Sequence, residues 1–180
     1  MTKTLLALLI WSAASTSVLE HARAQAPGPA VAPPAPRVEA TLNQLMRGTL
    51  YPESNVVFSA QDVNPADVPH AKDPAMSTDL LTSQFGKWDA VENSALAIAE
   101  TANLLTLPGR KCSNGLDVPV TNPDWPKFVQ QLRDAGMSAY AAAQTKNQDK
   151  MTDVAGELTT ACQNCHLRYR DRRNPASRCK

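Results

Sequence analysis

The sequence lacks a strong charge of either sign and lacks a long hydrophobic run. Its 180 residues contain 18 Lys and Arg against 17 Asp and Glu, which gives a formal net charge of +1. This balance gives no sign of the basic patch that nucleic-acid binders carry. The one apolar run, from Leu5 to Val18, is too short for a helix that crosses a bilayer. We therefore predict no nucleic-acid partner and no membrane span in the mature chain.

The apolar run instead has the features of a secretory signal peptide. It follows Lys3 and leads to the small residues of Ala22-Arg23-Ala24, a typical cleavage pattern. We predict a signal peptide over residues 1–24 and export to the periplasm. Its removal would leave 16 basic and 16 acidic residues. Residues 25–37 are rich in Pro and Ala and predict an extended tether.

Strand-like alternation is also missing, whereas four segments have helical periodicity. Apolar residues recur at steps of three or four from about Val38 to Leu50, Trp88 to Leu105, Trp125 to Ala143 and Met151 to Tyr169. Each segment has an apolar stripe of the kind that a helix bundle buries. We predict an all-α fold, an up-down-up-down four-helix bundle over residues 38–173, with a C-terminal tail over 174–180.

The first connection in this bundle is predicted to be long. Residues 51–77 include four prolines, at positions 52, 65, 69 and 74, and exceed the length of a simple bundle turn. We expect this segment either to pack along the bundle or to form part of a docking surface.

The most specific pattern is Cys162-Gln-Asn-Cys165-His166, the attachment signature of c-type haem. Two thiols three positions apart lie on one side of a helical turn, where both can add to the haem vinyl groups. The adjacent imidazole then points at the iron as an axial ligand. We predict one covalent haem c, held by Cys162 and Cys165 and ligated by His166, on the C-terminal helix.

Two other readings of the motif are half of a zinc site and a thiol–disulfide centre. A structural zinc site needs four ligands, and outside the motif only four candidates exist: Cys112, Cys179, His70 and His21. A thioredoxin-like motif would follow a strand in a βαβ pattern, which the sequence does not contain. Both alternatives are therefore disfavoured against haem.

Met46 is the candidate for the second axial ligand. It lies eight residues after the predicted helix start at Val38, which places it about 12 Å along the bundle axis. His166 lies about 10 Å from the same end in an up-down-up-down topology. The alternative is that Met46 fills the core, the commoner role of a helical Met. His70 would reach the iron only if the long connection folded back.

The haem motif on the last of four helices, within Cys-Gln-Asn-Cys-His-Leu-Arg-Tyr-Arg at 162–170, resembles the cytochrome c′ family of class II c-type cytochromes. In low-spin members a Met of the first helix ligates the iron, and the protein carries electrons. In cytochrome c′ proper an apolar residue covers a five-coordinate iron that binds NO or CO. Residues 42–47 are similar to the low-spin type. Family members often have an Arg where this chain has Leu42, so a propionate contact there is not implied.

The remaining cysteines and the C-terminal basic residues are predicted to meet at one end of the bundle. Cys112 follows the second helix and Cys179 follows the fourth, and an exported protein oxidises such neighbours. We therefore predict a Cys112–Cys179 disulfide. The cations that follow His166 either stabilise the helix C-terminus, pair a haem propionate through Arg168 or Arg170, or dock an acidic redox partner. Tyr169 is expected to pack near the haem.

No acid–base pair and no nucleophile with a base is recognisable in the sequence. We therefore predict a one-electron carrier that serves a periplasmic redox partner, rather than an enzyme. The alternatives are a five-coordinate cytochrome c′ that binds NO or CO, and a haem relay subunit of a larger periplasmic oxidoreductase. The family resemblance also implies a possible homodimer through the first two helices.

Overall fold

The computed structural model describes residues 35–180. The predicted signal peptide and residues 25–34 of the predicted tether lie outside this part of the chain. Within it, no helix is long and apolar enough to cross a membrane. The only β-structure among these residues is an isolated bridge between Lys111 and Asp117.

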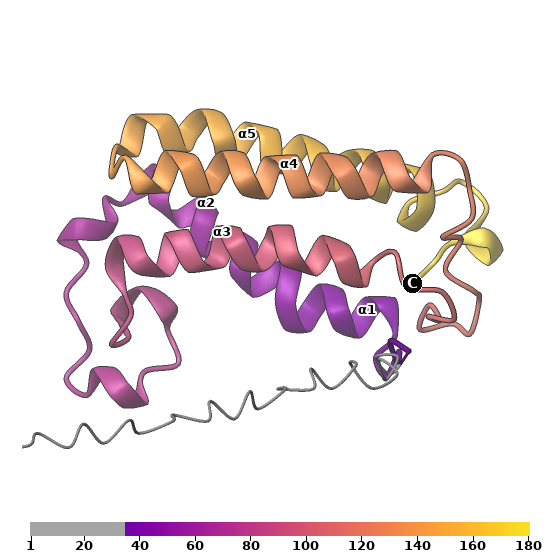
Figure 1. The fold of residues 1–180 in the computed structure, drawn as a ribbon, viewed down its shortest axis with the longest axis horizontal. Helices are drawn as coiled ribbons and strands as arrows, with labels where there is room; N and C mark the ends of the chain where they lie inside the picture. The colour runs from indigo at the N-terminus through magenta and orange to yellow at the C-terminus, as the bar shows by residue number, and fades with distance from the viewer. Residues whose placement is uncertain (1–34) are drawn as a thin grey trace, which may run out of the picture. The chain divides into compact units, whose positions relative to one another are not determined.

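Four long helical segments run back and forth along a bundle (Figure 1). The first consists of α1 (Leu42–Leu45), the π-helical turn η1 (Met46–Leu50) and α2 (Tyr51–Asp62). The others are α3 (Lys87–Leu104), α4 (Trp125–Gln144) and α5 (Gln148–Cys165), which continues into the π-helical turn η5 (His166–Arg170). α2 packs on α3, α3 on α4, α4 on α5, and α5 on α2. The predicted all-α, up-down four-helix bundle is confirmed.

The first helix begins at Leu42, four residues later than the apolar pattern indicated. Thr41 caps it: its hydroxyl accepts from the amide of Gln44 at 3.2 Å, and its own amide donates to Gln44 Oε1 at 2.9 Å. This reciprocal pair is a capping box, which satisfies two amides that the first turn leaves without partners. The start of the helix is therefore set by local side-chain chemistry.

The prediction that residues 51–77 form a connection is wrong for residues 51–62, which continue the first helix as α2. Pro52 falls in the first turn of α2, directly after the wider turn η1, where the Tyr51 amide donates to the Met46 carbonyl. In the first turn of a helix the backbone N–H groups have no partner within the helix, so a Pro, which lacks this N–H, costs no hydrogen bond there. Val56, Val57 and Ala60 are buried along this helix, and this burial stabilises it.

The first connection thus spans residues 63–86 and contains three short 3₁₀ turns: η2 (Pro65–Asp67), η3 (Pro74–Met76) and η4 (Leu80–Thr82). Its own backbone orders it, because the amide of Ala71 donates to the Thr82 carbonyl at 2.9 Å and that of Gln84 to the Pro74 carbonyl at 3.0 Å. A further 3₁₀ turn, η6 (Pro175–Ser177), lies in the C-terminal tail.

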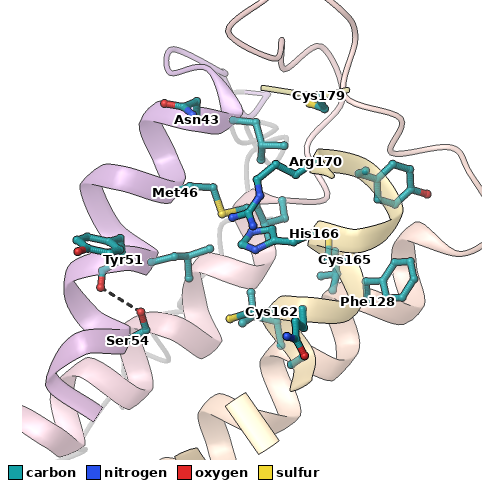
Figure 2. Close-up of a pocket in the computed structure, with 18 of the residues that line it drawn as sticks. Asn43, Met46, Tyr51, Ser54, Phe128, Cys162, Cys165, His166, Arg170 and Cys179 are labelled. Carbon is teal, nitrogen blue, oxygen red and sulfur yellow. Dashed lines mark hydrogen bonds between the residues drawn. The ribbon is translucent and has the colours of Figure 1, made fainter. Parts of the chain in front are cut away.

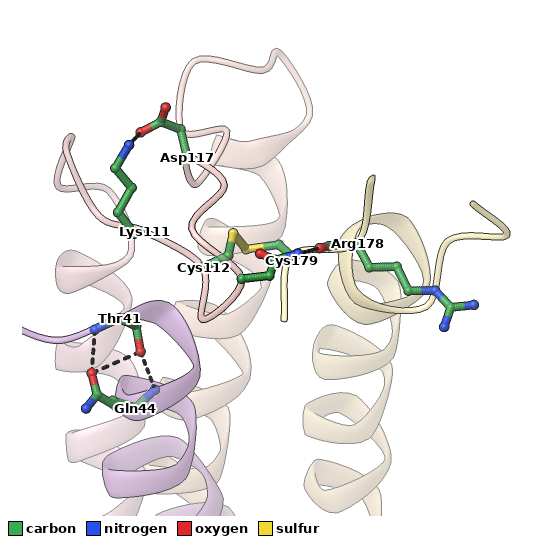
Figure 3. The surroundings of a disulfide bond; sticks show 8 residues. Thr41, Gln44, Lys111, Cys112, Asp117, Arg178 and Cys179 are labelled. Atoms are coloured by element: carbon green, nitrogen blue, oxygen red, sulfur yellow. Dashed lines mark hydrogen bonds and ion pairs between the residues drawn. A yellow bond between two sulfur atoms is a disulfide. The ribbon is translucent and has the colours of Figure 1, made fainter. Parts of the chain in front are cut away.

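The predicted Cys112–Cys179 disulfide is confirmed (Figure 3). It joins the α3–α4 connection to the C-terminal tail across 67 residues of sequence, with the two Cα atoms 5.1 Å apart. A disulfide of this kind indicates an oxidising compartment.

Candidate functional site

A cavity of about 740 Å³ lies between the first helix, α4 and the end of α5. Its wall is mainly apolar, and its volume is within the range of about 300–1,000 Å³ that small-molecule and cofactor sites occupy. All of the predicted site residues contribute to its lining: Met46, Cys162, Cys165, His166, Tyr169 and Arg170. The fold therefore brings residues from both ends of the sequence to one cavity.

The two motif cysteines and the histidine form one wall of the cavity (Figure 2). Cys162 and Cys165 occupy the last turn of α5, and His166 begins η5. The His166 amide donates to the Cys162 carbonyl, so the helix runs through the motif without a break. Positions i, i+3 and i+4 of a helix share a face, and all three side chains are half-buried there.

Burial controls the protonation of these groups. It raises the pKa of Cys162, and it raises the pKa of Cys165 to about 11 together with the nearby charges of Cys162 and Asp124. Both thiols are therefore protonated at neutral pH, unlike the thiolates of disulfide-exchange centres, whose pKa is low. Burial, and then the Arg170 charge, lower the pKa of His166. Its imidazole is therefore neutral at pH 7, the form that ligates metals.

Met46, the first residue of η1, lies on the opposite wall of the cavity. Its side chain points into the space in front of His166 (Figure 2). The flanking Leu42 and Leu50 line the same wall and are buried. Met46 is the only Met that the described residues contribute to the cavity wall. A thioether and an imidazole thus line the same mainly apolar cavity.

The other candidate ligands lie elsewhere. Nδ1 of His70 is hydrogen-bonded to the Ser83 carbonyl at 2.8 Å in the 63–86 connection, and His70 is exposed and does not line the cavity. Met137 is 45% exposed on α4, and Met151 is fully buried in the core. Among the described Met and His residues outside the motif, Met46 therefore is the candidate ligand that lines the cavity.

Tyr169 fixes η5 against the start of α4. Its ring is buried edge-on to Trp125 at 5.0 Å and to Phe128 at 6.1 Å between centroids. Its hydroxyl donates to Asp124 Oδ1 in a short hydrogen bond, while Arg168 Nε donates to Asp124 Oδ2 at 2.6 Å. The Tyr169 hydrogen bond, and then Arg168, lower the pKa of Asp124.

Asp124 is a residue whose role the sequence did not reveal. In the sequence it belongs to an Asn-Pro-Asp start of a helix, but its side chain makes no cap hydrogen bond. Its carboxylate instead accepts hydrogen bonds from Tyr169 and Arg168, which lie 45 and 44 residues further along the chain. No local pattern signals such a contact.

Arg170 is the only one of the two arginines considered for a haem propionate that lines the cavity. Arg168 is directed to Asp124 instead. Arg170 pairs with its neighbour Asp171 through Nε at 2.9 Å and Nη2 at 2.8 Å. The cavity lining also includes Arg47 of η1, which is exposed and was not singled out from the sequence.

The zinc alternative has no support from the described residues. No group of three or more His, Cys, Asp or Glu side chains in this range is arranged to hold a metal ion. Cys112 and Cys179 are consumed by their disulfide. A pair of thiols beside an imidazole, a thioether opposite and an apolar space between them suit a flat, covalently attached metal macrocycle better than a bare ion.

Comparison of this chain with protein-family models, with curated proteins and with solved structures gives no match. The geometry and chemistry of the cavity are therefore the basis for a functional assignment.

Proposed function

We propose that this chain is an exported monohaem c-type cytochrome that carries one electron at a time, of the low-spin, cytochrome c′-like type. One observation carries the proposal: Cys162, Cys165 and His166 line an apolar cavity whose opposite wall presents Met46. Two thiols and an imidazole with this spacing on one helix face are the attachment signature of haem c.

The proposed roles follow from the side chains. Cys162 and Cys165 would anchor haem c through thioether bonds, and His166 would ligate its iron through a neutral ring nitrogen. Met46 would supply a second protein ligand through its sulfur. When bound, the haem supplies an iron that alternates between the ferrous and ferric states. The apolar walls would exclude water from the iron, and a second protein ligand would block the binding of small molecules.

Arg170 is proposed to compensate the negative charge of a haem carboxylate, because its guanidinium lines the cavity while remaining about half exposed. An Arg–carboxylate pair is a strong, charge-assisted contact. Arg172, Arg173 and Lys180 extend the positive charge beyond it. We propose that this end of the molecule meets an acidic periplasmic redox partner.

The disulfide supports the periplasmic part of the proposal, since it indicates an oxidising compartment. The signal peptide over 1–24, a homodimer and a haem relay role in a larger oxidoreductase stay predictions. Copurification from native periplasm would distinguish a free carrier from a relay subunit.

The first test is covalent haem attachment. The full chain is produced with export and a haem-maturation system, and its mass is measured under denaturing conditions. We expect one haem bound to the wild type and none to the Cys162→Ser/Cys165→Ser double variant. Gln163→Ala, which changes the motif between the two anchors, is the matched control and should retain haem. A wild type without covalent haem would overturn the proposal.

The second test concerns Met46. We expect a low-spin spectrum that CO does not alter in the reduced wild type, and a high-spin, CO-binding form in Met46→Ala. The rival function, a five-coordinate NO or CO binder, is favoured by Leu42 and Leu50, which flank Met46 and could cover the iron instead. A wild type that binds CO rapidly, with a spectrum that Met46→Ala leaves unchanged, would establish this rival.

A further inference from the structure

The connection between α3 and α4 is bonded to the helix that carries Met46. Arg110 Nη1 donates to the carbonyl of Ala40 at 2.6 Å, directly before the capping residue Thr41. The amide of Leu42, the first residue of α1, donates to the Lys111 carbonyl at 2.8 Å. The entry of the chain into the first helix is therefore fixed by two consecutive residues of this connection.

The same connection is bonded to the segment that follows His166. Cys112 forms the disulfide with Cys179, and the Cys179 amide donates to the Tyr169 carbonyl in η5 at 3.0 Å. Asn114 Nδ2 donates to the Arg178 carbonyl at 2.7 Å. Figure 3 shows the disulfide and the capped start of α1 on either side of this connection. Residues 110–114 thus join the two walls of the cavity.

Arg110 and Cys112 are the buried members of this set, and Arg110 is the charged one. Only 5% of its surface is exposed, and its Nη2 donates to the carbonyl of Leu104, the last residue of α3, at 3.1 Å. A hydrogen bond from a charged group to a carbonyl is stronger than a neutral one. A guanidinium that spans the end of α3 and the entry to α1 therefore holds these two elements at a fixed separation.

We infer that residues 110–114 form a brace that sets the gap between the Met46 wall and the His166 wall, and that Arg110 is a positioning residue for Met46. The inference rests on the proposed function. Met46 lies one turn beyond Leu42, and η1 packs on α3, while the cavity separates it from η5. At the other end of the bundle α2 packs directly on α5. At this end the brace connects the two walls in place of direct packing.

The test uses the haem-loaded full chain and compares Arg110→Gln with the wild type. Loss of two charge-assisted bonds should shift the equilibrium between Met46-bound and open iron by about tenfold or more. We expect a high-spin fraction, faster CO binding and a changed reduction potential. Arg110→Lys should restore part of the low-spin signal. Asp117→Asn, which breaks the exposed Lys111–Asp117 pair in the same connection, is the matched control and should match the wild type.

A second variant, Cys112→Ala/Cys179→Ala, removes the bond between the brace and the C-terminal tail. It should also raise the high-spin fraction and speed CO binding. It decides the question if Arg110→Gln does not fold. Low-spin spectra identical to the wild type, in variants with native helix content, would overturn the brace and leave the cytochrome proposal intact. A wild type without haem, or with a spectrum independent of Met46, would overturn the ligand assignment on which the inference rests.

Discussion

The half of the bundle around the end of α2 is filled with side chains, whereas the half around η1, the start of α2 and η5 is hollow. In the filled half, α2 packs directly on α5, and the side chains at its centre are completely buried: Val57, Val91, Ala139, Ala143, Met151 and Leu158. In the hollow half, the same helices enclose a cavity of about 740 Å³. One bundle therefore combines a close-packed core with an open site.

The two halves are held together in different ways. The filled half depends on close approach, since a Cβ on Gly136 of α4 would lie 2.9 Å from the Ala99 amide nitrogen of α3. The hollow half depends on bonds around its rim, namely the Cys112–Cys179 disulfide and the hydrogen bonds of Arg110. The side chains that line a cavity lose van der Waals contacts across it, so covalent and charge-assisted bonds are needed to fix the separation of its walls.

The largest expected effect lies in the filled half. Leu158→Ala removes a fully buried side chain and should lower the free energy of unfolding by about 2–5 kcal/mol, because the close-packed surroundings cannot collapse into the space. Denaturant titration measures it. Leu167→Ala, at a residue of η5 that is 64% exposed, is the control and should stay within about 0.5 kcal/mol of the wild type. Equal losses would contradict the contrast between the two halves.

The next effect concerns the rim of the hollow half. Cys112→Ala/Cys179→Ala opens a cross-link over 67 residues and should lower the free energy of unfolding by about 2–4 kcal/mol. Hydrogen exchange should rise first at the start of α1, in residues 110–118 and in η5. An increase of the same size throughout α2 and the first half of α3 would show that the disulfide does not act locally on the hollow half.

Two glycines test close approach with opposite expected signs. Gly136→Ala should destabilise the protein by about 1–3 kcal/mol, because the added Cβ meets the α3 backbone at Ala95 and Ala99. Gly156→Ala, on α5, meets nothing within 4 Å and should stabilise it by about 0.5–1 kcal/mol through helix propensity. Thermal unfolding of both variants gives the comparison. A stabilising Gly136→Ala would mean that α3 and α4 can separate at little cost.

The smallest effect is a pH dependence at the hollow half. The Tyr169 hydroxyl, and then Arg168, hold the pKa of Asp124 below its ordinary value of 3.8. The folded state therefore binds the proton less readily than the unfolded state, and the stabilisation is present above about pH 4 and is lost as the pH falls through the folded-state pKa. Asp124→Asn should flatten the acid limb of the stability curve.

Tyr169→Phe serves as the matched variant, because it removes only the hydroxyl that donates to Asp124. It should flatten part of the same limb in denaturant titrations run at a series of acid pH values. An acid limb unchanged in both variants would show that this contact does not contribute to stability.

Much of the architecture was predictable from local patterns. The apolar stripes located α3, α4 and α5 closely, and the Cys-x-x-Cys-His run located the cavity wall. The prediction is wrong at Pro52, which lies in the helix and not in the connection. Pro breaks a helix when it stands in the interior of regular α-helical turns. Here the wider π-helical turn η1 directly precedes Pro52, which therefore lies in the first turn of α2, and the helical segment continues through it. Burial of Val56 and Val57 then favoured continuation.

Local patterns are enough to set the helix class, the positions of three helices and the placement of two thiols and an imidazole on one helix face, because these depend on residues a few positions apart. Packing between distant segments sets how far the first helix extends. It also sets the hydrogen bond from Tyr169 to Asp124 and the one from Arg110 to Ala40, 70 residues away in the sequence. Such contacts join segments with no pattern in common. Their geometry exists only after the helices have packed.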